Sequence, residues 1–250
     1  MPENTLYPHV SVDCVVLGFD GFHFNVLLLK RTGVEGEQPF NDLKLPGGLI
    51  FANEDLDAAA HRIVGEHINT NALFLRQFQS FGSPSRTSHP RDVHWLEKAV
   101  QLKIGRIVTV GYLALIRISS TLRFHSKTVQ AMWVPLKQVS KLAFDHNQIL
   151  DEAVREVREI VVRDPSIVFN LLPKRFTASQ MRLVYEELFG QPLDVRNFHK
   201  KMSRMAYVVP LDEFEEQVAH RAARYYRFDR KLYLKVHGGF HPNRSSLYGQ

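Results

Sequence analysis

Cysteine, long hydrophobic runs and a leader-like start are what this sequence lacks. Cys14 is the one cysteine among 250 residues, so the chain forms no internal disulfide and suits a reducing compartment. Its place in the apolar run VSVDCVVLGF predicts a buried structural thiol. The start MPENTLYPHV has no basic region before an apolar stretch, and no run is long enough to span a membrane. We therefore expect a cytoplasmic protein with no membrane partner.

Charge of one sign does not dominate either, although the balance is basic. The net charge is +6 and the isoelectric point is near 9.4. Basic residues outnumber acidic ones between Pro173 and Met205. Such clustering, more than net charge, indicates a nucleic-acid surface. The length is comfortable for two domains.

Strand-like runs and one amphipathic helix follow each other through the first half of the chain. The expected strands are 9–17, 24–31, 43–45, 72–81, 106–118 and 131–135. The segment 32–42 contains glycine and proline and is predicted to be a loop. A helix is expected over 54–68, with Asn53 as its cap, because apolar residues recur there at helical spacing. Together these elements predict a mixed sheet with helices on both faces.

The stretch 82–105 is long for a connection between strands. Loops of this length are commonly lids or partner surfaces, and a short helix is expected over 93–102. A solvated surface insertion is the alternative. A long amphipathic helix then begins at Asp145 and is predicted to end at Asp164, before a proline.

The C-terminal part predicts a helix-turn-helix. Thr177 and Gln180 form a capping box, Gly190 is suited to end the helix, and a second helix follows Asp194. The exposed side of that second helix is basic, which suits DNA, although a helical pair with a solvated charged face is the alternative.

A β-hairpin with a basic tip is expected next, which favours the DNA-binding interpretation. Runs 226–228 and 232–236 alternate on either side of Asp229-Arg230-Lys231, as the wing of a winged helix does. Arginine and asparagine suit base edges, and lysine suits phosphates. The expected DNA contacts are Arg196, Asn197, His199, Lys200 and Arg204 from the second helix, Arg175, Thr177, Ser179 and Lys201 at phosphates, and Arg230 and Lys231 at the wing.

The segment 45–70, LPGGLIFANEDLDAAAHRIVGEHINT, resembles the Nudix box, G-x5-E-x7-R-E-U-x-E-E-x-G-U, in which U is a bulky aliphatic residue. The matching residues are Gly48, Glu54, Arg62, Val64 and Glu66. Among the departures from it, Ile63 replaces the first helical glutamate, His67 the last, and Asn69 the glycine.

The resemblance implies the Nudix fold but not Nudix hydrolysis. In that family the helical glutamates bind magnesium or manganese ions, which hold a diphosphate and activate water. Hard cations need several oxygen ligands, and here Glu66 is the one carboxylate left among the three positions. We therefore predict no catalytic residue, no metal and no cofactor.

A degenerate Nudix domain followed by a winged helix is similar to the Nudix-related transcriptional regulators, and segments 142–150, 169–201 and 223–229 resemble that family. The resemblance implies an α+β protein: a mixed-sheet α/β/α Nudix-like sandwich followed by a winged helix-turn-helix domain. The boundaries are predicted as an effector-binding domain at 1–145, a connecting helix at 146–164, a DNA-binding domain at 165–240 and a tail at 241–250. A homodimer on a palindromic operator is expected.

The family leaves two effector classes open. NrtR-type regulators of NAD metabolism sense ADP-ribose-type nucleotides, and AraR-type regulators respond to L-arabinose. The long insertion and the missing carboxylates favour the AraR type, a repressor released from DNA by the sugar. The candidate effector residues are Lys44, Glu66, Phe81, His89, Arg91 and His94. A Nudix hydrolase with an accessory domain and a binding module without a DNA role are the rival hypotheses.

Overall fold

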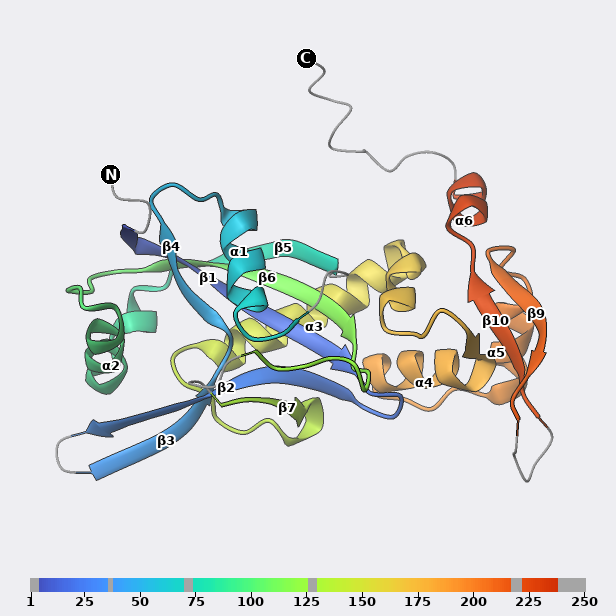
Figure 1. The fold of residues 1–250 in the computed structure, drawn as a ribbon, viewed down its shortest axis with the longest axis horizontal. Coiled ribbons are helices and arrows are strands. Elements are labelled where there is room, and N and C mark those ends of the chain that lie inside the picture. The colour runs from blue at the N-terminus through green and yellow to red at the C-terminus, as the bar shows by residue number, and fades with distance from the viewer. Residues whose placement is uncertain (1–4, 36–37, 70–73, 126–129, 217–221, 238–250) are drawn as a thin grey trace, which may run out of the picture. The chain divides into compact units, whose positions relative to one another are not determined.

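The computed structural model describes residues 5–35, 38–69, 74–125, 130–216 and 222–237 (Figure 1). The chain divides into two compact units, Met1–Leu171 and Leu172–Gln250. Among the described residues, no helix is both long enough and apolar enough to cross a membrane. The predicted tail at 241–250 lies outside the described residues.

The first unit is built on a seven-stranded mixed sheet. Its main path runs β3-β2-β1-β6-β5, and β4 and β7 pair with β1 and β2. The central pair β1 and β6 is parallel, and the other pairs are antiparallel. The strands are β1 (Leu6–Phe19), β2 (Phe24–Glu35), β3 (Gln38–Lys44), β4 (Gly47–Phe51), β5 (Phe74–Phe81), β6 (Val108–Arg117) and β7 (Ala131–Pro135).

Helices cover both faces of this sheet. Alternate residues of β1 and β6 form one core cluster with the helix α1 (Leu56–Gly65), as the two-residue period of a strand requires. The long helix α3 (His146–Arg163) packs against β1, β5 and β6 and buries the opposite set of side chains. The nine consecutive buried residues that end β1 fit a strand covered on both sides. The predicted α/β/α arrangement is therefore confirmed (Figure 1).

The predicted loop at 32–42 is wrong, because β2 and β3 continue through it as a hairpin. Their register runs from Leu29 opposite Lys44 to Glu35 opposite Gln38. Gly33 suggested a turn, but it lies inside the strand, where a Cβ would stand 2.6 Å from the ring of Phe40. Glycine here permits a close approach rather than a bend. The strand β4 was not predicted.

Helix starts differ from the expectation by a few residues. Asp55, not Asn53, caps α1, accepting a hydrogen bond from the Ala58 amide at 2.7 Å. The insertion contains a short 3-10 helix η1 (Pro84–Thr87) and the helix α2 (Pro90–Val100), which begins at a proline and so precedes the predicted start. The helix α3 begins after Asp145 and ends at Asp164, as predicted, and lies within the first unit. Two further 3-10 turns are η2 (Leu136–Gln138) and η3 (Pro165–Asn170).

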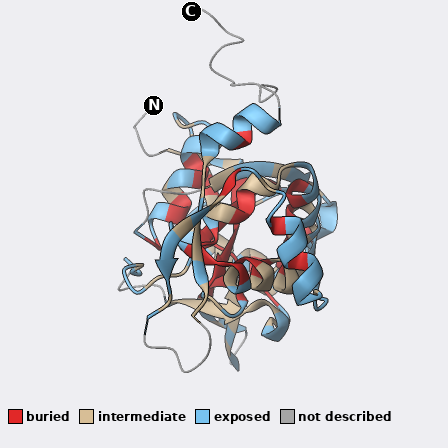
Figure 2. Ribbon diagram, turned by 90° about the vertical axis from the view of Figure 1, so that its right-hand side faces the viewer, coloured by how far each residue is buried: buried red, intermediate tan, exposed pale blue. Residues whose placement is uncertain are grey.

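The second unit contains a helix-turn-helix and a three-stranded sheet of order β8-β10-β9. The Thr177–Gln180 capping box is present, Gly190 ends the first helix at φ 69°, and Asp194 caps the second. The elements are β8 (Phe176–Thr177), α4 (Ala178–Phe189), α5 (Val195–Met202), β9 (Val208–Phe214), β10 (Arg224–Phe228) and α6 (Arg230–Val236). Figure 2 colours each described residue by its burial, with buried residues red and exposed residues pale blue.

The second unit contains the predicted wing, but the predicted position of its second strand is wrong. The hairpin is β9 with β10, and the segment 230–236 is the helix α6. Asp229 accepts the Leu232 amide at 3.1 Å and so starts a helix rather than a turn. In this helix Tyr233 is buried, whereas Leu232 and Leu234 are exposed. The tip between β9 and β10 includes 217–221, outside the described residues.

Candidate functional site

The Nudix-box arginine and glutamate hold the start of α1 against β4. Arg62 donates from Nε to Glu54 at 3.0 Å and from Nη2 to the Leu49 carbonyl at 3.3 Å. Glu54 also accepts the Phe51 amide at 2.8 Å. The hydrogen bonds from Arg62 hold the pKa of Glu54 below its usual value. These contacts fix the fold of the box and leave neither side chain free for chemistry.

The three positions that carry metal ligands in a Nudix hydrolase do not fit a divalent cation here. Ile63 is buried in the core. His67 is buried, and burial together with the nearby Lys44 ammonium lowers its pKa, so the ring is neutral. Glu66 is ion-paired with Arg62 at 3.0 Å. Within the described residues, no group of three or more histidine, cysteine, aspartate or glutamate side chains is arranged to hold a metal ion.

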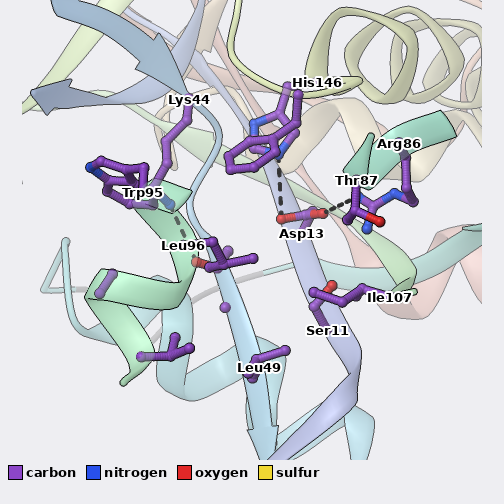
Figure 3. Close-up of a pocket in the computed structure, with 15 residues that line it drawn as sticks. Ser11, Asp13, Lys44, Leu49, Arg86, Thr87, Trp95, Leu96, Ile107 and His146 are labelled. Carbon is purple, nitrogen blue, oxygen red and sulfur yellow. Dashed lines mark hydrogen bonds and ion pairs between the residues drawn. The ribbon is translucent and has the colours of Figure 1, made fainter. Parts of the chain in front are cut away.

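A cavity of about 150 Å³ opens beside the box (Figure 3). Strands β1 and β4 form one wall, and the insertion, with α2, forms another. The lining residues are Ser11, Asp13, Lys44, Gly47, Gly48, Leu49, Arg86, Thr87, Trp95, Leu96, Ala99, Val100, Ile107, Phe144 and His146. The insertion 82–105 therefore contributes to a pocket wall and is more than a solvated surface loop.

Asp13 organises the polar side of this cavity, between His146 and Arg86 (Figure 3). Its carboxylate lies 3.2 Å from Arg86 Nη2 and 3.7 Å from His146 Nε2. Burial opposes its ionisation, but the charge of Arg86 and the hydroxyl of Thr109 hold the pKa of Asp13 below its usual value. Gly47 is required beside it, because a Cβ there would stand 1.9 Å from Asp13 Oδ1.

His146 is held as a neutral ring. Its Nδ1 accepts a hydrogen bond from the Leu45 amide at 2.9 Å, so the proton of the neutral ring is on Nε2, facing Asp13. Burial lowers the pKa of His146 to about 4, and Asp13 only partly opposes this. The positive charge beside Asp13 is therefore that of Arg86, which also pairs with Asp145 at 3.0 Å.

Lys44 lies at the end of β3 and lines the same cavity. Its Nζ donates to the carbonyl oxygens of Leu45 at 3.1 Å and Gly47 at 3.3 Å. Burial lowers its pKa, while Asp13 opposes this. In the described part of the chain, no carboxylate lies within ion-pairing range of this ammonium group.

The helix α2 is fastened over the cavity by a buried arginine. Arg31 donates to Asp42 at 2.8 Å and to Asp92 of α2 at 2.7 Å. Its guanidinium also lies 5.2 Å from the ring centre of Trp95, whose Nε1 donates to the Thr32 carbonyl at 3.0 Å. These contacts join the β2–β3 hairpin to the insertion.

A second cavity, of about 240 Å³, adjoins the first. The two share Arg86 and Phe144 in their walls. The second is lined by Ser83, Ser85, Arg86, His89, Arg91, Asp92, Lys141, Leu142, Phe144, Asp145 and Gln148. Its lining is mostly polar, with hydroxyl, amide, guanidinium and ammonium groups suited to hydrogen bonds with a polar ligand.

The predicted effector residues are spread over several places. Lys44 lines the first cavity, and His89 and Arg91 line the second. Glu66 is absent from both linings, and Phe81 is buried in β5, packed edge to face with Phe78. His94 is exposed on α2 and lines neither cavity.

Asp13, Arg86 and His146 were missed at the first cavity, although Arg86 falls in the insertion that the sequence singled out. A charged residue within the apolar run VSVDCVV was the available signal for Asp13.

The predicted DNA-binding residues of the second helix share one exposed side. Only Phe198 and Met202 of α5 are buried, and they point away from it. Among the described residues, no ion pair neutralises Arg196, Lys200, Lys201 or Arg204. The exposed members are Arg196, Asn197, His199, Lys200, Lys201 and Arg204.

The other predicted contacts are placed less favourably. Thr177 is buried and its hydroxyl accepts the Gln180 amide, which makes it a poor candidate for a phosphate contact. Ser179 is exposed, and Arg175 is exposed but paired with Glu213. Arg230 and Lys231 lie in the first turn of α6 rather than at the tip of the wing. The basic residues on the actual wing strand are Arg224 and Arg227, which the sequence did not single out.

Comparison with known proteins gives matches over both units. Residues 7–159 match the model of the NUDIX domain, and residues 168–228 match that of the NrtR DNA-binding winged helix domain. The chain is 28% identical over 225 residues to the "ADPR responsive transcriptional repressor NtrR" of Acinetobacter baylyi, covering 88% of this chain and 82% of that protein.

Solved structures share the fold. NrtR of Shewanella oneidensis is 23% identical, with a TM-score of 0.64, over 88% of this chain and 94% of its own. The same protein with a 27mer DNA gives a TM-score of 0.65 at 23% identity, over 89% and 94% of the two chains. A MutT/nudix family protein of Enterococcus faecalis is 25% identical, with a TM-score of 0.55, over 89% and 88%.

The NUDIX match alone spans more than half of the chain. The domain that follows it matches a DNA-binding domain, which is typical of a regulator. The chain therefore belongs to the Nudix family and carries, behind its Nudix domain, a DNA-binding winged helix domain of the NrtR type.

Proposed function

We propose that the protein is a transcriptional repressor whose Nudix domain binds an ADP-ribose-type nucleotide and whose winged helix domain then leaves its operator. The observation that carries this proposal is the pairing of a Nudix domain at 7–159 with an NrtR winged helix domain at 168–228. The Acinetobacter baylyi relative is named for ADPR response and repression, and its match to this chain extends over both domains, covering 88% of this chain. The preference for L-arabinose has no support in these comparisons.

The cavities support a ligand of nucleotide size only when taken together. Small-molecule sites are commonly about 300–1,000 Å³, and each cavity alone is smaller. Arg86 and Phe144 line both cavities, so the two adjoin, and this supports one ligand that extends over both. The first cavity offers Trp95 for stacking, and the second offers polar groups for a ribose or phosphate.

The exposed face of α5 supports the DNA-binding part of the proposal. It presents arginine, asparagine and lysine side chains with no neutralising ion pair among the described residues. A homodimer on a palindromic operator remains part of the proposal, because two-fold symmetric proteins read two-fold symmetric sites.

A direct test needs the operator first. Selection from random duplexes on the full chain yields a consensus, and fluorescence anisotropy then measures release from it by ADP-ribose or L-arabinose. We expect a palindromic consensus and an apparent DNA affinity at least tenfold lower with saturating ADP-ribose, a coupling of about 1.4 kcal/mol. L-Arabinose should change nothing. Binding without sequence preference, or release by the sugar alone, contradicts the proposal.

The hydrolase alternative is tested in parallel. With ADP-ribose and magnesium, AMP release should stay at background, because the carboxylates needed for a hard cation are missing. Release well above background that Glu66→Gln abolishes would revive the enzyme.

A further inference from the structure

A Nudix domain that binds a diphosphate must balance its negative charge, and the usual divalent cation has no place here. Ile63 is buried, His67 is neutral, and Glu66 is engaged with Arg62. The positive charge that balances the diphosphate must therefore come from the protein itself, that is, from charged side chains in the cavity wall.

Four titratable side chains line the first cavity: Asp13, Lys44, Arg86 and His146. Arg86 is neutralised at contact distance by Asp13 and Asp145. His146 is neutral. Among the described residues, no carboxylate contacts the Lys44 ammonium; burial lowers its pKa, and the charge of Asp13 opposes this and favours the protonated form.

The geometry of Lys44 leaves room for a ligand. A protonated amine has three N–H groups, and two of them point to the carbonyl oxygens of Leu45 and Gly47. Those carbonyls belong to the glycine-containing loop that opens the Nudix box. The third N–H has no acceptor among the described residues, and the side chain lines the cavity (Figure 3). An ammonium fixed in this way is a preorganised donor to a phosphate oxygen.

We infer that Lys44 takes over the charge of the missing cation: its ammonium group binds the diphosphate of the nucleotide, so that recognition needs no metal. The inference rests on the proposed function for the identity of the nucleotide. It goes further in naming the group that holds the phosphates and in making binding independent of magnesium.

The first experiment uses the full chain without any substitution. Isothermal titration calorimetry measures the affinity for ADP-ribose in buffer with EDTA and in buffer with magnesium chloride. We expect the two affinities to agree within about twofold, since the Lys44 ammonium, rather than a metal ion, contacts the diphosphate. Binding that EDTA abolishes and magnesium restores overturns the inference, whatever the variants show.

The second experiment compares Lys44→Met with Lys44→Arg, both in EDTA. Loss of the ammonium should weaken ADP-ribose binding at least tenfold, and arginine should recover part of the loss. The matched control is Lys98→Met, which removes one positive charge from exposed α2 without touching either cavity. Equal affinity of Lys44→Met and the wild type overturns the inference, as does a loss of the same size in Lys98→Met.

Inorganic diphosphate separates this inference from the proposed function. Suppose that the wild type binds diphosphate, that Lys44→Met does not, and that neither binds ADP-ribose. The proposed nucleotide is then wrong, but the assignment of Lys44 to the phosphates stands. If the wild type binds neither probe, the inference fails together with the proposed function. Thermal unfolding of each variant excludes loss of the fold as the cause of weakened binding.

Discussion

Asp13 is a single buried residue that contacts elements far apart in the sequence. It meets Arg86 from the insertion and His146 from the start of α3, and it requires glycine at position 47. A buried carboxylate is tolerated because cations and hydrogen bonds compensate for its lost hydration. The sequence contained its signal, a charge inside an apolar strand, but the partners could be found only from the fold.

His146 gives this residue network a pH dependence. An unfolded histidine has a pKa near 6.5, whereas the folded ring titrates at about 4. The unfolded state therefore binds more protons between these values, and folding stability falls as pH drops through this window. We expect the free energy of unfolding of the first unit to fall by about 2 kcal/mol from pH 7 to pH 5 through His146 alone.

The replacement His146→Gln, whose side-chain oxygen can still accept the Leu45 amide, should flatten that dependence. Urea unfolding followed by tryptophan fluorescence measures it, because both tryptophans, Trp95 and Trp133, are in the first unit. Some slope should remain from His67, whose pKa is also lowered. The exposed His94→Gln is the control. A slope unchanged by His146→Gln would show that another group titrates.

At the scale of elements, α2 depends on a buried ion pair more than on an apolar face. Arg31 is fully buried and holds Asp42 and Asp92. Removing one member of such a group leaves charges uncompensated, which costs about 3–5 kcal/mol. Arg31→Leu should therefore lower the free energy of unfolding by that amount and raise amide hydrogen exchange first in Pro90–Val100.

The exposed pair of Arg155 with Glu152 provides the comparison. Its arginine is 65% exposed, and such pairs contribute roughly 0–1 kcal/mol. Arg155→Leu should leave exchange in α2 unchanged. If Arg31→Leu is as mild as this control, α2 is held by its aromatic contacts instead.

The same scale shows what local sequence can and cannot predict. Helix ends marked by a side-chain cap, as at Thr177 and Asp194, or by a left-handed glycine, as at Gly190, were found because capping is decided within a few residues. Strand pairing is decided by distant residues. The segment 230–236 alternates like a strand, but β10 pairs with β9, so only the fold excluded it from the wing.

The candidate site was predictable only in part, for a related reason. Lys44 adjoins a motif with fixed spacing, and the insertion was identified because it is long for a connection between strands. The two cavities are made by residues from β1, β4, η1, α2 and the start of α3, and their convergence is a property of the sheet order. No spacing in the sequence could show it.

For the whole molecule, the proposed function requires that ligand binding in one domain alter DNA binding in the other. It also requires that DNA binding be assigned to individual residues. Phosphate contacts and base contacts differ in their salt dependence and sequence dependence. Each neutralised phosphate contributes about 0.9 to the slope of log affinity against log salt concentration. That difference distinguishes the roles of exposed residues on α5.

Lys201 and Arg196 are expected to behave differently in this measurement. Lys201→Ala should weaken binding similarly on operator and unrelated DNA and reduce the salt slope by about 1. Arg196→Ala should cost about 1–3 kcal/mol of binding free energy on the operator and relax the preference at one base pair.

Lys98→Ala on the Nudix domain controls for net charge. An unaltered slope for Lys201→Ala counts against a phosphate contact, and unchanged operator affinity removes Arg196 from the interface. Because both side chains are exposed on α5, the variants should keep the fold, so a change in DNA binding reports the interface itself.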